Sequence, residues 1–124
     1  MIAAGCDVGS LTTKAVILNN TRIISQAVAK SSFNPEDSAR EVMQNALTAA
    51  GLGMGDIGFC VGTGYGRERI PFVGKAVSEI ACHAKGAHWL LPTVRTIIDI
   101  GGQDCKAIRL DAKGNVVKFI TNDK

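Results

Sequence analysis

The sequence lacks the features of membrane and nucleic-acid-binding proteins. No apolar run approaches the ~18 residues needed to cross a bilayer, and the amino-terminal MIAAGCDVGS has no charged region of the kind that opens a signal peptide. The net charge of +3 is spread thinly, without a block of five or six basic residues. A role at nucleic acid or a membrane surface therefore has no electrostatic basis. We expect a cytoplasmic protein that binds neither.

Cysteine patterns typical of zinc and redox sites are also missing. The four cysteines (Cys6, Cys60, Cys82 and Cys105) never occur as a CxxC pair. In a reducing compartment they are expected to be free thiols. Cys82 and His83 are adjacent, but a metal site needs three or four converging ligands. We predict no structural metal site from these residues.

At 124 residues, 46% of them hydrophobic, the chain can bury one modest core. Apolar runs and turns predict three antiparallel strands, at residues 2–7, 15–18 and 22–29. A helix then begins after Asn34, with Pro35 at its first position, and ends at Gly51. A short strand within residues 57–67 and a second helix over 75–91 complete a βββαβα unit.

The same pattern restarts after Pro92. DVGSLTTKAVIL, which begins at Asp7, and DIGGQDCKAIRL, which begins at Asp99, share Asp, Gly, Lys, Ala and Leu at identical offsets. Such self-similarity indicates a duplicated structural unit. We predict an α/β protein with a first subdomain at residues 1–92 and an incomplete second one at 93–124. The latter contains the first three strands of the repeat, so we expect the amino-terminal piece of a longer protein.

The repeated loops suit a phosphate ligand. A glycine turn brings backbone N–H groups close to a ligand, and hydroxyls and a lysine add donors. Asp7 and Asp99 occupy matching places. Carboxylates repel phosphate unless a divalent cation lies between them, so Mg²⁺ held partly through water is expected at this pair. Either loop alone could be an ordinary hairpin, because Asp often starts a turn.

GTGYGR, at residues 62–67, fits neither the Walker pattern nor the dinucleotide-binding pattern, and we interpret it as a strand-to-helix connection. In combination, however, VGTGYGR, EIACHAKGAH and DIGGQD resemble the BadF/BadG/BcrA/BcrD family. The two loops are similar to the phosphate-1 and phosphate-2 motifs of the actin, Hsp70 and sugar kinase superfamily. The resemblance, which covers nearly the whole chain, implies a ribonuclease H-like fold that binds ATP or ADP with Mg²⁺.

The resemblance also implies a role for individual residues. The phosphate-1 loop would comprise Gly9, Ser10, Leu11, Thr12, Thr13 and Lys14, and the phosphate-2 loop Gly101, Gly102 and Gln103. The catalytic residues would be Asp7, Asp99 and Gln103, of which the two aspartates would hold Mg²⁺, partly through water. Lys106, beyond the second turn, would either contribute to this loop or be a solvated strand residue. Glu79 and residues 82–86 would lie on the helix between the units, near a hinge or partner surface.

The family comprises activators of 2-hydroxyacyl-CoA dehydratases and ATP-binding subunits of benzoyl-CoA reductases, in which a homodimer carries one [4Fe–4S] cluster. The resemblance places the first cluster cysteine just after NDK, where this sequence stops. We therefore expect the cluster only in a longer chain, and weakened or absent ATP turnover here. The leading hypothesis is an ATPase piece of an electron-transfer activator. The alternatives are a small-molecule kinase of the same superfamily and a non-catalytic nucleotide-binding module.

Overall fold

The computed structural model describes residues 1–123 and contains two compact units, Met1–Val77 and Ser78–Lys124. The sequence repeat predicts a boundary after Pro92, whereas the boundary between the two compact units lies after Val77, so that the second helix belongs to the same unit as the second sheet. The reason is physical: this helix packs its apolar side onto the strands that follow it in the chain.

The first unit is built on a five-stranded mixed sheet with the order β3-β2-β1-β4-β5. β1 (Ile2–Val8), β2 (Thr12–Asn19) and β3 (Arg22–Lys30) form the predicted antiparallel meander. β4 (Phe59–Thr63) and β5 (Lys75–Ala76) extend the sheet in parallel pairing. As a result, the carboxyl ends of β1 and β4 lie side by side at one edge.

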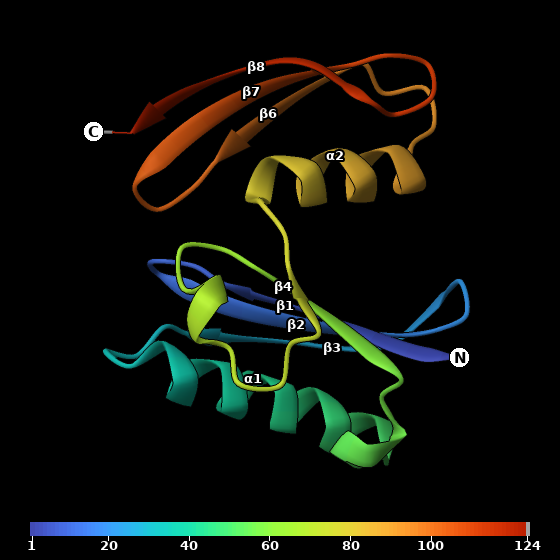
Figure 1. Cartoon of the computed structure of the whole chain (residues 1–124), viewed down its shortest axis with the longest axis vertical. Coiled ribbons are helices and arrows are strands. Elements are labelled where there is room, and N and C mark those ends of the chain that lie inside the picture. Colours follow the sequence, from blue (N-terminus) through green and yellow to red (C-terminus); the bar gives the residue numbers. More distant parts are fainter. Residues whose placement is uncertain (124) are drawn as a thin grey trace. The chain divides into compact units, whose positions relative to one another are not determined.

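One helix, α1 (Pro35–Ala50), covers a face of this sheet (Figure 1). Its predicted ends are confirmed. The Asn34 side chain accepts a hydrogen bond from the Glu36 N–H, and Gly51 ends the helix in the left-handed conformation at φ 70°. Buried residues of α1 pack on alternate residues of β1 and β2, as expected for one apolar helix stripe on one sheet face. The core members from α1 are Ala39, Val42, Met43, Ala46 and Leu47.

The segment between β4 and the second helix differs from the expectation. Two short 3₁₀ helices flank β4, at Met54–Asp56 and Arg67–Arg69. The helix predicted to begin at Lys75 begins at Glu79 instead, where the Ser78 hydroxyl accepts from the Ala81 N–H. The prediction of a helix at Lys75 is wrong because Lys75 and Ala76 pair with β4 as strand β5.

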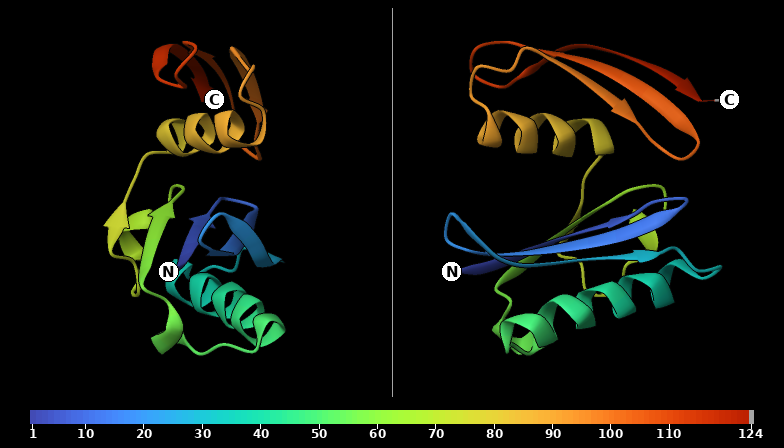
Figure 2. Two further views of the ribbon diagram at one scale, coloured as in Figure 1. Left: turned by 90° about the vertical axis from the view of Figure 1, so that its right-hand side faces the viewer. Right: turned by 180° about the vertical axis from the view of Figure 1, so that it is seen from behind.

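The second unit consists of one helix and an antiparallel sheet. α2 (Glu79–Leu90) lies along β6 (Thr96–Ile100), β7 (Asp104–Leu110) and β8 (Val116–Asp123), as the right-hand view of Figure 2 shows. Ala84 of α2 packs with Ile108 and Leu110 of β7 in a small core. Within residues 1–123, no helix is long and apolar enough to span a membrane.

Candidate functional site

The β1–β2 hairpin places a charged pair at the base of a tight turn. Asp7 and Lys14 are cross-strand partners, and Asp7 Oδ2 lies 3.3 Å from Lys14 Nζ. The Gly9 N–H donates to the Thr12 carbonyl at 3.0 Å, and a Cβ on Gly9 would lie only 2.8 Å from that oxygen. Glycine is therefore required for this turn. Lys14 is 42% exposed, so its ammonium is accessible to an anion.

Two side-chain hydroxyls, those of Thr13 and Ser31, stabilise this turn. Thr13 is fully buried, and its Oγ1 lies 2.9 Å from Ser31 Oγ, which donates to the Gly9 carbonyl at 2.6 Å. The Thr13 hydroxyl thus supports the turn and does not face a ligand. Ser10 and Thr12 are only partly buried, which leaves their hydroxyls as the donors of this loop.

The GTGYGR turn, whose sequence suggested a plain connection, lies against Asp7. Thr63, at the end of β4, is the parallel-strand partner of Asp7. Gly64 has φ 93°, and a Cβ there would lie 2.6 Å from Asp7 Oδ1. Arg67 Nη1 fixes the turn by donating to the Gly64 carbonyl at 3.0 Å. The feature of the sequence that could have indicated this contact is the alternation of glycines around Thr63 and Tyr65.

The Thr63 hydroxyl oxygen is buried and has no hydrogen-bond partner within the described residues. A buried polar atom without a partner needs a water, an ion or a ligand to satisfy it. Its strand position beside Asp7, at the carboxyl ends of two parallel strands, is a common place for ligands in α/β sheets. The residues of this edge therefore fit a hydrated cation with a phosphate.

The second hairpin repeats the geometry of the first. Asp99 of β6 and Lys106 of β7 are cross-strand partners, as Asp7 and Lys14 are. The Gly101 N–H donates to the Asp104 carbonyl at 2.8 Å, which matches the bond from Gly9 to Thr12 in the first turn. Gly102 and Gln103 are exposed at the tip of the turn, where they are open to a ligand. The repeat read in the sequence is therefore a repeat of backbone hydrogen bonds.

The alternative that Lys106 is a solvated strand residue is wrong. Its side chain is only 6% exposed, and its Nζ lies 2.9 Å from Asp104 Oδ1, 3.5 Å from Glu79 Oε2 and 3.8 Å from Asp99 Oδ2. Burial lowers the pKa of Lys106, but the hydrogen bond to Asp104 and the negative charges of Glu79, Asp104 and Asp99 outweigh it, so the pKa is raised. The lysine therefore stays charged.

His83 of α2 also reaches this hairpin. Its Nδ1 lies 2.9 Å from the Glu79 backbone carbonyl, which can only accept, so Nδ1 carries a hydrogen. Its Nε2 lies 3.7 Å from Asp99 Oδ1. The first two turns of α2 thus contact Asp99 directly through His83, and Glu79 contacts Lys106.

The cysteines do not fit a cluster. All four are free thiols in the structure, and Cys6 and Cys60 are buried. Burial, with the nearby Cys60 and Asp7, raises the pKa of Cys6 to about 12, and burial raises that of Cys60 to about 11. Metal ligation needs the thiolate, and the raised pKa values disfavour it.

Over residues 1–123, no group of three or more His, Cys, Asp or Glu side chains is placed to hold a metal ion. Mg²⁺ remains compatible, because it needs only one or two carboxylates beside waters and phosphates.

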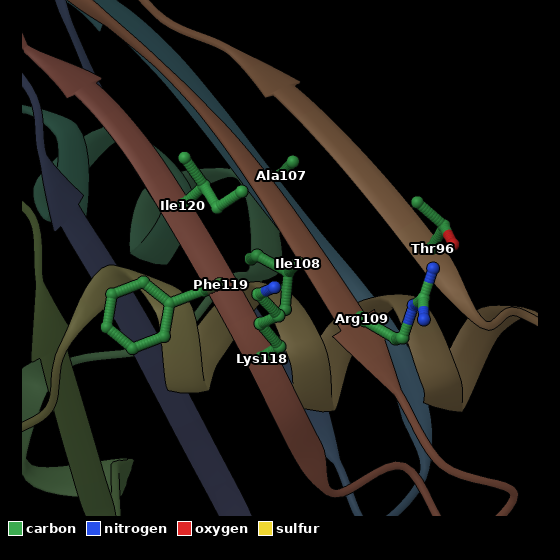
Figure 3. Close-up of a pocket in the computed structure, with 7 residues that line it drawn as sticks. All are labelled: Thr96, Ala107, Ile108, Arg109, Lys118, Phe119 and Ile120. Atoms are coloured by element: carbon green, nitrogen blue, oxygen red, sulfur yellow. The ribbon is translucent and has the colours of Figure 1, made fainter.

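A pocket lies on the second sheet, over β6, β7 and β8 (Figure 3). Its polar lining includes Thr96, Arg109 and Lys118, the rest is apolar, and no carboxylate takes part. It therefore does not fit a magnesium site, and its lining includes neither Asp99 nor the loop residues Gly101, Gly102 and Gln103.

Comparison with known proteins connects this geometry to a family. The activator of lactoyl-CoA dehydratase from Anaerotignum propionicum is 47% identical over 124 residues, which are all of this chain and 48% of that protein. A benzoyl-CoA reductase component from Thauera aromatica is 32% identical over 95% of this chain and 43% of its own length. The chain thus spans about half the length of these curated relatives.

Solved structures agree with the fold. The activator of the 2-hydroxyisocaproyl-CoA dehydratase from Clostridium difficile, with bound ADPNP, has a TM-score of 0.94 at 39% identity, over all of this chain and 46% of that one. A ROK hexokinase from Thermus thermophilus has a TM-score of 0.65 at 13% identity, over 94% of this chain and 48% of that one, which shows the fold alone. The predicted ribonuclease H-like fold is confirmed. The model of the BadF/BadG/BcrA/BcrD ATPase family matches residues 4–124, and the chain belongs to that family.

Proposed function

We propose that this chain is the nucleotide-binding part of an ATP-hydrolysing electron-transfer activator for a 2-hydroxyacyl-CoA dehydratase or a benzoyl-CoA reductase. The observation that carries the proposal is the repeated hairpin, in which an aspartate pairs with a lysine below a glycine turn. Membership of an ATPase family and the similar structure with bound ADPNP support a nucleotide as the ligand.

The proposed role of each residue follows from its charge and its exposure. Lys14, accessible at the first turn, binds a phosphate oxygen, and the backbone and hydroxyls of residues 9–12 line the same loop. Asp7 and Asp99 hold the Mg²⁺ that comes with ATP, partly through water; the ion offsets the charge of the phosphates. Gln103, exposed at the second turn, orients the attacking water.

The proposal extends to assembly and compartment. The partners are the dehydratase or reductase components that such activators serve, and the activator is a homodimer. No cluster ligand is assigned to Cys6 or Cys60, because their raised thiol pKa values disfavour the thiolate. The compartment we propose is the cytoplasm, where thiols stay reduced.

The test is a titration of the ¹⁵N-labelled chain with Mg·ATP, followed by amide shifts in NMR spectra, which detect millimolar binding. We expect shifts at residues 9–14 and 101–103. A charged hydrogen bond contributes about 1.5–3 kcal/mol, so Lys14→Met should weaken binding by roughly tenfold or more. Lys113→Met, at an exposed lysine of the β7–β8 turn, should bind as the wild type does.

Two results would count against the proposal: unchanged amides in both turns at saturating Mg·ATP, or equal affinity of wild type and Lys14→Met. A panel of sugars and carboxylic acids incubated with Mg·ATP separates the alternative activity, because only a small-molecule kinase would leave a phosphorylated product.

A further inference from the structure

The two lysines at matching positions of the repeat have different surroundings. Lys14 is 42% exposed and has one carboxylate partner, Asp7. Lys106 is 6% exposed and has three carboxylates within 3.8 Å. A side chain that is buried among its own counter-ions is not available to a ligand phosphate. Lys106 therefore does not repeat the role of Lys14.

The three carboxylates around Lys106 belong to different elements. Asp99 lies near the end of β6 and Asp104 at the start of β7, so they bracket the turn at residues 101–103. Glu79 is the first residue of α2. One ammonium group thus connects both ends of the turn with the start of the helix, and His83 adds a second contact from α2 to Asp99.

This arrangement is sensitive to charge at the turn. Breaking a buried ion pair by removing a partner is costly, so Lys106 must keep counter-ions. A divalent cation at Asp99 would repel the ammonium and weaken the contact that is already the longest of the three, at 3.8 Å. Lys106 would then depend more on Asp104 and Glu79. A ligand that interacts differently with two arrangements shifts their populations.

We propose that Lys106 is a positioning residue that couples the turn at residues 101–103 to the first turns of α2, so that charge bound at the turn changes how α2 packs on β7. The proposal rests on the proposed function, since it takes the turn to be a phosphate site. It differs from that function in that the coupling exists without any ligand.

The first experiment needs no nucleotide. In NMR spectra of the full chain, Glu79→Gln should shift the amides of residues 101–104, because the Glu79 carboxylate reaches the turn through Lys106. In the Lys106→Met background the same substitution should leave these amides in place. Glu41→Gln on the exposed side of α1 and Lys113→Met are the matched controls, and neither should move the turn.

The second experiment adds Mg·ATP. In the wild type we expect shifts both at residues 101–103 and at residues 79–83 of α2. In Lys106→Met the turn should still shift, whereas the shifts in α2 should be lost. Equal α2 shifts in both proteins would overturn the coupling.

The two proposals fail in distinguishable ways. Absence of any Mg·ATP shift contradicts the proposed function, while the nucleotide-free experiment still decides the role of Lys106. If Lys106→Met does not fold, Glu79→Gln decides alone, because it changes a partly exposed carboxylate by one atom. If the amide shifts of residues 101–104 are unchanged in folded Glu79→Gln, Lys106 does not couple α2 to the turn.

Discussion

Gly64 combines two demands that only glycine meets. Its φ of 93° is unfavourable for other residues, and a Cβ would collide with the Val8 carbonyl and the Asp7 carboxylate. We predict that Gly64→Ala destabilises the first unit by more than about 1 kcal/mol and moves Asp7. Urea unfolding followed by NMR signals of β1 measures the first effect, and the affinity for Mg·ATP measures the second.

Substitutions at two other glycines distinguish backbone strain from steric collision as the cause of the destabilisation. Gly51 has φ 70° but open space around it, so Gly51→Ala should cost about 1 kcal/mol from backbone strain alone. Gly55 has neither a positive φ nor a neighbour within 4 Å, and Gly55→Ala should be near neutral. Equal costs for Gly64→Ala and Gly51→Ala would show that the close approach of residue 64 to the Val8 carbonyl and the Asp7 carboxylate adds no destabilisation beyond backbone strain.

The sequence predicted the residues of each hairpin but not their burial. The matching positions of Asp7, Lys14, Asp99 and Lys106 follow from the repeat, and strand pairing brings each aspartate opposite its lysine. The burial of Lys106 depends on α2 packing over β7 and on a carboxylate, Glu79, that is distant in the sequence. Such a contact leaves no local pattern to read.

At the level of elements, local sequence signals were sufficient to predict α1. The start of α2 was predicted wrongly, because the residues before it form a strand through a non-local pairing. Asn34, Pro35 and Gly51 are adjacent to the helix they bound, so α1 was predicted at both ends. Lys75 and Ala76 have no strand signature of their own. Their pairing with Val61 and Gly62 of β4 makes them a strand. Tertiary contacts here override local preference.

The cap of α1 gives a test at this scale. Asn34 Oδ1 accepts from the Glu36 N–H at 2.9 Å, which satisfies one free donor of the helix end. We predict that Asn34→Ala destabilises the first unit by about 1 kcal/mol, whereas Asn34→Ser, which keeps a cap, costs much less. The measurement is the urea midpoint from NMR signals of α1. Equal loss in both variants would mean that the cap bond is not the cause.

At the level of the whole chain, the two units contain cores of different size. The first unit buries side chains from β1, β2, α1 and β4 in one cluster. The cluster of the second unit has Ala84, Ile108 and Leu110 as its buried members. Buried apolar area is the main favourable term in folding, so the two units should differ in stability. A single free energy of unfolding would then not describe the chain.

Native-state hydrogen exchange measures this difference directly. We predict that amides of β7 exchange through openings of lower free energy than amides of β2, because fewer buried apolar side chains hold β7 in place. Ile108→Val should lower the opening free energy of β7 by about 0.5–1.5 kcal/mol and leave that of β2 unchanged. Val42→Ala, in the core of the first unit, should lower the opening free energy of β2 and leave that of β7 unchanged. If both strands open with one common free energy, and each substitution lowers both equally, the prediction is wrong and the chain unfolds as one cooperative unit.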